Sequence, residues 1–153
     1  MRIASFAEFW PFYIGQHREL RCRIVHFIGT NGFVLLALGC IIARPTTMIP
    51  VALLDAVIFT LAFKMEAHRN AAPVLLLGIL LAVIANPAML GAIAFAYAWA
   101  WVGHFLIEGN RPATFTYPLW SLAGDFRMCG AMWRGQLWAG RGEEIAGTEP
   151  KAG

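Results

Sequence analysis

The hydrophobic residues of this chain lie in long uncharged runs rather than in the short amphipathic patterns of soluble domains. Residues 24–43 contain no charged side chain, residues 46–63 are interrupted only by Asp55, and residues 71–107 contain no Lys, Arg, Asp or Glu. About 20 apolar residues in a helix cross the roughly 30 Å of hydrocarbon in a bilayer. The pattern therefore predicts an all-α, polytopic membrane protein.

The third run is too long for one crossing, and Asn86-Pro87 lies near its middle as a turn signal. We therefore predict about four short transmembrane helices, at residues 24–43, 46–63, 72–86 and 88–107. The third is shorter than the usual span. It could cross in a tilted position or form half of a re-entrant hairpin.

The distribution of charge predicts the orientation of these spans. With four spans, eleven of the twelve Lys and Arg residues fall on one side of the membrane, and Arg44 alone falls on the other. Cytoplasmic loops carry an excess of Lys and Arg, so both termini are expected in the cytoplasm. A three-span arrangement would place the C-terminal basic residues opposite the N-terminal ones and lose this bias.

The flanking segments are rich in aromatic residues, which favour the headgroup region of a membrane. Ser5 and Glu8 have the spacing of a capping box at the start of a short helix. We expect N- and C-terminal interfacial helices, the second at about 125–137, within a single membrane domain of residues 1–138. Residues 139–153 are polar and Gly-rich and are predicted to be a disordered tail.

Composition agrees with a membrane protein and excludes some other classes. The chain is 59% hydrophobic and 14% charged, whereas soluble domains average about 45–50% and about 25%. The net charge of +3 could indicate nucleic-acid binding, but the basic residues are scattered, and no nucleic-acid partner is expected. Three cysteines without a CxxC spacing predict neither a disulfide framework nor a zinc knuckle.

All four histidines fall at the predicted cytoplasmic face. His17 and His26 flank the start of the first span, His68 lies in a loop, and His104 lies in the last turn of the fourth span, four residues before Glu108. Imidazoles with a carboxylate suit non-haem Fe(II). His17 and His26 are nine residues apart, on opposite faces of one straight helix, so the helix must break between them if both are to bind one metal.

Other readings of these residues remain open. Interfacial histidines can simply hydrogen-bond to headgroups or carbonyl groups. Asp55 lies about nine residues from the cytoplasmic face, roughly 13 Å along a helix, and is expected to be structural rather than part of a site with the histidines. The chain could therefore be a metal-dependent enzyme, a haem-binding helical bundle, or a non-catalytic scaffold or lipid-binding subunit.

Two motifs resemble the signatures of a family of small membrane proteins. The first is Phe9-Trp-Pro-Phe-Tyr13 followed by His17-Arg18 and His26-Phe-Ile-Gly-Thr30, and the second is Trp101-Val-Gly-His-Phe-Leu-Ile-Glu108 followed by Asn110-Arg-Pro-Ala113. The bacterial branch of the family also shares Thr114-Phe-Thr-Tyr-Pro-Leu-Trp-Ser121 and Gly124-Asp-Phe-Arg-Met128. The family includes the fungal Fe(II)-dependent 2-hydroxy fatty acid dioxygenase of phytosphingosine breakdown.

The resemblance implies an Fe(II)-dependent α-oxidation, in which a long-chain 2-hydroxy fatty acid reacts with O₂ and loses one carbon. It also implies a bacterial inner-membrane protein. Carried over to this chain, the metal ligands would be His17, His26 and His104, and Glu108 would be a ligand or a supporting residue. Arg111 or Arg18 could pair with the carboxylate of the substrate. The first signature commonly has Asn-Pro after His-Arg, whereas this chain has Glu19-Leu20.

Overall fold

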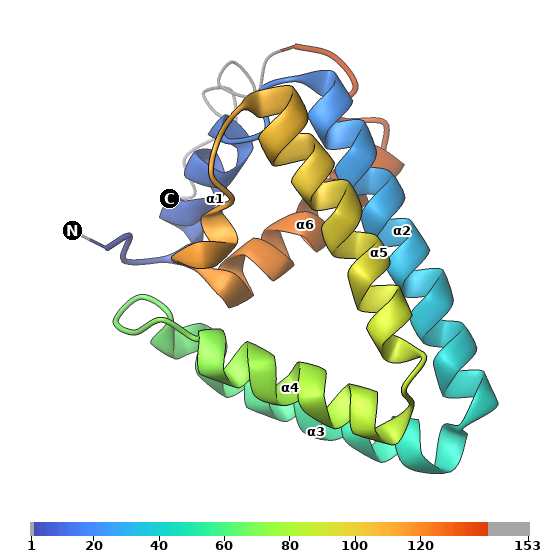
Figure 1. Ribbon diagram of the computed structural model, residues 1–153. Coiled ribbons are helices and arrows are strands. Elements are labelled where there is room, and N and C mark those ends of the chain that lie inside the picture. Colours follow the sequence, from blue (N-terminus) through green and yellow to red (C-terminus); the bar gives the residue numbers. More distant parts are fainter. Residues whose placement is uncertain (1, 141–153) are drawn as a thin grey trace.

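The computed structural model describes residues 2–140 and is all-α (Figure 1). Among these residues the elements are α1 (Phe6–Gly15), α2 (Leu20–Ala43), α3 (Pro45–Met65), α4 (Ala72–Ala85), α5 (Met89–Trp101), the π-helical η1 (Val102–Glu108), the 3₁₀ turn η2 (Ala113–Phe115) and α6 (Pro118–Trp133). The helix η1 continues α5, so the two form one apolar helix, Met89–Glu108. The predicted all-α class is confirmed.

The four predicted spans correspond to α2, α3, α4 and α5–η1, with ends that differ by at most four residues. Three of them are long and apolar enough to cross a membrane, and α4 is the shorter apolar helix. The turns lie where the sequence predicts them: Pro45 is the first residue of α3, and the Asn86 side chain accepts a hydrogen bond from the Ala88 N–H (3.1 Å) just after α4 ends. The chain is an integral membrane protein.

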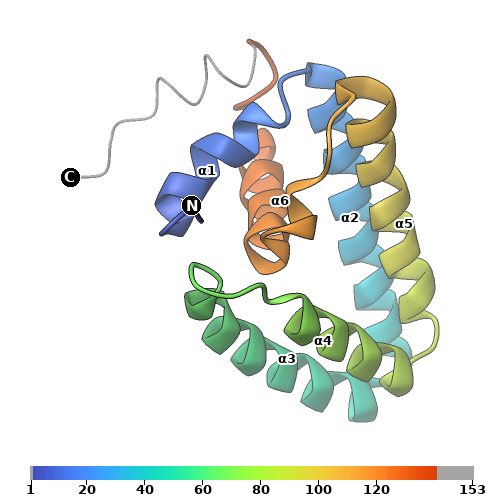
Figure 2. The same cartoon turned by 60° about the vertical axis from the view of Figure 1, so that its left-hand side comes forward.

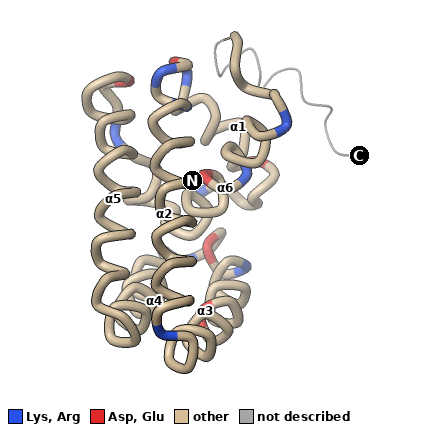
Figure 3. The backbone as a smooth tube through the Cα atoms, turned by 90° about the vertical axis from the view of Figure 1, so that its right-hand side faces the viewer, with Lys and Arg blue, Asp and Glu red and all other residues tan. Residues whose placement is uncertain are grey.

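The long helices form two antiparallel pairs that diverge from one end (Figure 1). In the α2–α5 pair the backbones approach closely because small residues face the partner helix: a Cβ at Gly29 would lie 3.0 Å from the Cβ of Trp99, and one at Gly32 would overlap the Phe95 ring. The central turns of α2 and α5 carry no charged residue (Figure 3). Large apolar side chains such as Leu35 on α2 and Leu90 on α5 are exposed on these helices, as expected in contact with lipid.

Helix α6 lies in the space bordered by α1 and by the two helix pairs (Figure 2). It begins at Pro118 rather than at about residue 125, because the carboxylate of Glu66, which is fully buried, accepts hydrogen bonds from the Leu119 and Trp120 N–H groups (3.3 and 2.6 Å) and caps its first turn. An aromatic cluster joins α6 to α1; its buried members are Phe9, Trp10, Tyr13, Ile14, Ala113, Tyr117, Trp120, Met128 and Met132. The depth of α1 and α6 relative to the membrane stays a prediction.

Candidate metal centre

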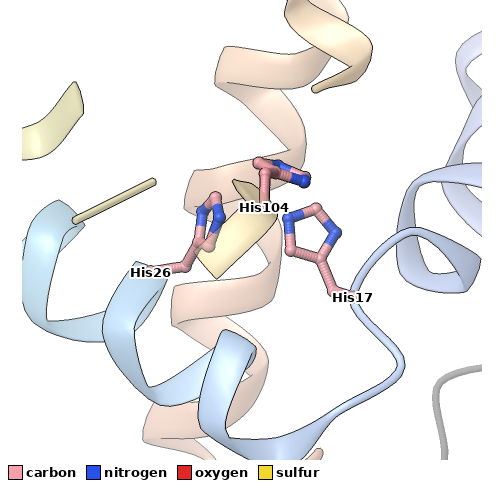
Figure 4. Close-up of side chains that lie close together, drawn as sticks. All are labelled: His17, His26 and His104. Carbon is pink, nitrogen blue, oxygen red and sulfur yellow. The ribbon is translucent and has the colours of Figure 1, made fainter. Parts of the chain in front are cut away.

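Three histidines from three different parts of the chain meet beside α6. His17 comes from the segment between α1 and α2, His26 from the second turn of α2, and His104 from η1. Figure 4 shows the three rings directed toward one another. One ring nitrogen from each lies within 4.8 Å of the others, and the rings are 0–4% exposed. The sequence predicted these three as metal ligands, and the fold brings them together.

A break in the helix places His17 opposite His26. Helix α1 ends at Gly15 and α2 begins at Leu20. The Arg23 guanidinium, which is fully buried, donates to the backbone carbonyls of His17 and Arg18 (2.9 and 2.8 Å) and holds the intervening segment against α2. The ring centroids of His17 and His26 are then 4.5 Å apart. The break is made without the Asn-Pro pair of the family signature.

The π-helical turn sets the position of His104. The segment ends at Gly109, whose φ of 63° is the left-handed conformation that glycine adopts readily. The chain then turns back, so that the Asn110 N–H donates to the His104 carbonyl (3.0 Å) and the Asn110 Oδ1 lies 2.7 Å from the His104 Nδ1. Isolated π-helical turns are frequent at functional sites. Here the turn packs the histidine and its hydrogen-bond partner together.

Each of the three imidazoles has its Nδ1 occupied by a hydrogen-bond acceptor. The acceptors are the Tyr13 carbonyl for His17, the Asp125 carboxylate for His26 and the Asn110 side chain for His104, each at 2.7 Å. The Asn110 amide nitrogen donates to the Gln16 carbonyl (2.8 Å), which identifies its oxygen as the atom facing His104. The protons are therefore assigned to Nδ1, and the Nε2 lone pairs are left available to a metal.

The surroundings of His17 favour its neutral imidazole. Burial lowers the pKa of His17 well below its ordinary value, and the neighbouring His26 and His104 lower it further. Among the described residues, the Nε2 atoms of His17 and His26 are buried without a hydrogen-bond partner. Buried polar atoms of this kind are uncommon and call for an explanation. Three imidazoles this close together, two of them with an unsatisfied Nε2, form a suitable ligand set for a transition metal.

Asp125 contacts the histidine cluster, and the sequence reasoning did not select it as a candidate site residue. Its Oδ1 lies 2.7 Å from the His26 Nδ1 and accepts a 2.5 Å hydrogen bond from the Tyr13 hydroxyl. Burial, together with the charge of Asp125, raises the pKa of Tyr13 well above its ordinary value, so the phenol remains a donor. Asp125 and Asn110 both lie within the motifs noted above, and the presence of a single carboxylate in α6 was the available signal.

The other candidate residues lie outside the histidine cluster. The Glu108 side chain, 1% exposed, accepts a 2.7 Å hydrogen bond from the Glu19 N–H and lies 3.6 Å from the Arg18 guanidinium. Arg111 is exposed, with its guanidinium 4.8 Å from the Phe115 ring centroid. His68 lies in the turn after α3, away from the cluster.

An apolar cavity of about 560 Å³ opens beside the histidines. Its walls include His26, His104 and Asp125, and it follows the continuous helix α5–η1 from Met89 to His104, about 22 Å of helix. The size is within the usual range for small-molecule sites, about 300–1,000 Å³. Asp55 on α3 also lines the cavity, and its buried Oδ1 has no hydrogen-bond partner among the described residues.

Comparison with known proteins identifies the family. Neither the curated proteins nor the solved structures include a match to this chain. The match to a protein family covers residues 3–137, which includes every element described above. The chain belongs to the Mpo1-like family, described as 2-hydroxy-palmitic acid dioxygenase Mpo1-like.

Proposed function

We propose that this protein is an Fe(II)-dependent dioxygenase that shortens a long-chain 2-hydroxy fatty acid by one carbon. The observation that carries the proposal is the set of three buried imidazoles, of which one ring nitrogen each lies within 4.8 Å of the others, and two of which, His26 and His104, line an apolar cavity. The description of the family supplies the class of substrate. The cavity would hold the acyl chain, and the acid and hydroxyl groups would lie beside the histidines.

The residues fit a bound iron ion. His17, His26 and His104 would hold it through Nε2, since imidazole suits iron and three protein ligands leave positions open for substrate and O₂. When bound, iron would supply the redox chemistry that joins O₂ to the 2-hydroxy acid. Overall, the 2-hydroxy acid and one O₂ give the shortened acid, CO₂ and water, and O₂ accepts the four electrons that the acid loses.

The protein's own residues would position the ligands and the substrate. Asp125 and Tyr13 fix the ring of His26. Glu108 lies against the segment that carries His17, so we assign it a positioning role rather than a place in the ligand set. Arg111, which precedes Pro112 and Ala113 of the cavity wall, would pair with the substrate carboxylate at the mouth.

The proposal is tested by metal content and turnover in the same preparation. Anaerobically purified protein should contain about one iron per chain and convert 2-hydroxypalmitic acid to the C15 acid only with O₂. His104→Ala should lose both properties. His68→Ala is the matched control, because this histidine lies outside the cluster, and it should keep both. Full activity in iron-free protein would refute the proposal.

The same experiment separates the alternatives. A scaffold or lipid-binding subunit would contain no metal, and its histidine variants would behave normally. A haem protein would show a Soret band. The geometry disfavours haem, because the three ring centroids lie only 4.5–5.1 Å apart, leaving no space for a porphyrin between two of the rings.

A further inference from the structure

Ser121 is one of the polar side chains on the cavity wall that have no role in the arrangement described so far. Helix α6 contributes Ser121 and Asp125 to the lining. The two are four residues apart, so they lie on one face of the helix, one turn from each other. Asp125 holds His26. Ser121 therefore faces the cavity one turn from the carboxylate that supports the candidate metal centre.

The hydroxyl of Ser121 is buried without a partner. The residue is 2% exposed, and its Oγ has no hydrogen bond among the described residues. The Ser121 N–H already donates to the Tyr117 carbonyl (2.8 Å), so the backbone of this turn is satisfied. A helical serine often bonds back to the carbonyl four residues earlier. Here the hydroxyl does not, and a buried unpaired hydroxyl destabilises the protein.

Such an atom is explained if a ligand provides the missing partner. Of the polar groups of a 2-hydroxy acid, the carboxylate is the poorer match, because Asp125, one turn away, also carries a negative charge and would repel it. The neutral 2-hydroxyl meets no such repulsion. A hydroxyl can both donate to and accept from another hydroxyl, so the pair satisfies both groups in an apolar cavity.

We infer that Ser121 is a specificity-determining residue whose hydroxyl hydrogen-bonds the 2-hydroxyl of the substrate. This inference rests on the proposed function and extends it: Ser121 distinguishes a 2-hydroxy acid from the unsubstituted acid of equal length. An unsubstituted acid filling the cavity leaves the serine hydroxyl unpaired and excluded from water. Sites built around a substrate hydroxyl reject analogues that lack it for this reason.

The inference predicts a change in selectivity rather than a general loss of binding. Ser121→Ala should weaken binding of 2-hydroxypalmitic acid by about tenfold, the loss expected for one net hydrogen bond of about 1.4 kcal/mol. Binding of palmitic acid should be unchanged or tighter, because the alanine leaves no unpaired hydroxyl. Ser121→Thr keeps the hydroxyl and should retain most of the preference for the 2-hydroxy acid.

A matched control removes a hydroxyl elsewhere. Thr60 on α3 donates to the Ala56 carbonyl (2.6 Å) and lines a neighbouring groove with Phe63 and Leu119, but it does not line this cavity. Thr60→Val should leave the affinities for both acids unchanged.

The experiment measures anaerobic dissociation constants of 2-hydroxypalmitic and palmitic acid for the full-length, iron-loaded protein and the three variants. Iron content is determined in parallel and should be the same in all four proteins. The inference is overturned if Ser121→Ala weakens the binding of both acids equally, changes neither dissociation constant, or retains the preference for the 2-hydroxy acid. A wild-type protein that holds no iron and converts no 2-hydroxy acid would instead refute the proposed function, so the two failures are distinguishable.

Discussion

The carboxylate of Glu108 is expected to act on iron binding through His17. Replacing Glu108 with alanine removes the acceptor of the Glu19 N–H at the start of α2. A hydrogen bond to a charged group contributes about 1.5–3 kcal/mol. The ion pair with Arg18, whose side chain is 48% exposed, adds less than about 1 kcal/mol. The segment that carries His17 should therefore lose about 2 kcal/mol of its preference for the observed position.

Because 1.4 kcal/mol corresponds to a factor of ten, Glu108→Ala should weaken Fe(II) affinity by about 30-fold. The assay is an anaerobic titration of Fe(II) against a competing chelator, with thermal unfolding measured in parallel. Glu108→Gln keeps an acceptor oxygen for the Glu19 N–H, so it should weaken Fe(II) affinity only a few-fold.

A double-mutant cycle tests the route of this effect. If Glu108 acts only by positioning His17, then Glu108→Ala should weaken Fe(II) affinity by less than about threefold in protein that already carries His17→Ala. Substitutions of coupled residues have non-additive effects. A full 30-fold loss in the His17→Ala background would refute the reasoning. It would show instead that Glu108 binds the metal itself or supports another ligand.

Three further predictions follow from the same contacts. Asp125→Asn should weaken Fe(II) affinity about 10–100-fold in the same titration, because the carboxylate partner of a ligating histidine contributes to this extent. Gly103→Ala should perturb the site through packing: its new methyl would lie 3.0 Å from the His26 ring, whereas that of the control Gly91→Ala would meet nothing within 4 Å. Gly103→Ala should lower the iron content of the protein, and Gly91→Ala should not. Glu66→Ala should lower the free energy of unfolding by about 2–4 kcal/mol, since two buried N–H groups of α6 lose their acceptor. Thermal unfolding in detergent checks this value, and a change below 0.5 kcal/mol would contradict the capping role.

Much of the architecture could be predicted from local sequence features. The positions of α2 to α5 follow from uncharged runs, and their ends follow from Arg44-Pro45 and Asn86-Pro87. These signals act within a few residues of where they occur, because hydropathy and the backbone restriction of proline need no tertiary partner. The start of α6 was predicted less well, because its first turn is capped by Glu66, about fifty residues earlier in the chain.

The sequence alone determined that the histidines gather at one end of the long helices, because that follows from the length and order of the spans. Only the tertiary structure decided that His17, His26 and His104 share one point. Their convergence depends on the break held by Arg23 and on the π-helical turn before Gly109. The tertiary structure also brings Asp125 next to His26, from which it is separated by 99 positions in the sequence. Contacts between residues so distant in the chain leave no periodic pattern, so the ligand types could be read from the sequence but their supporting hydrogen bonds could not.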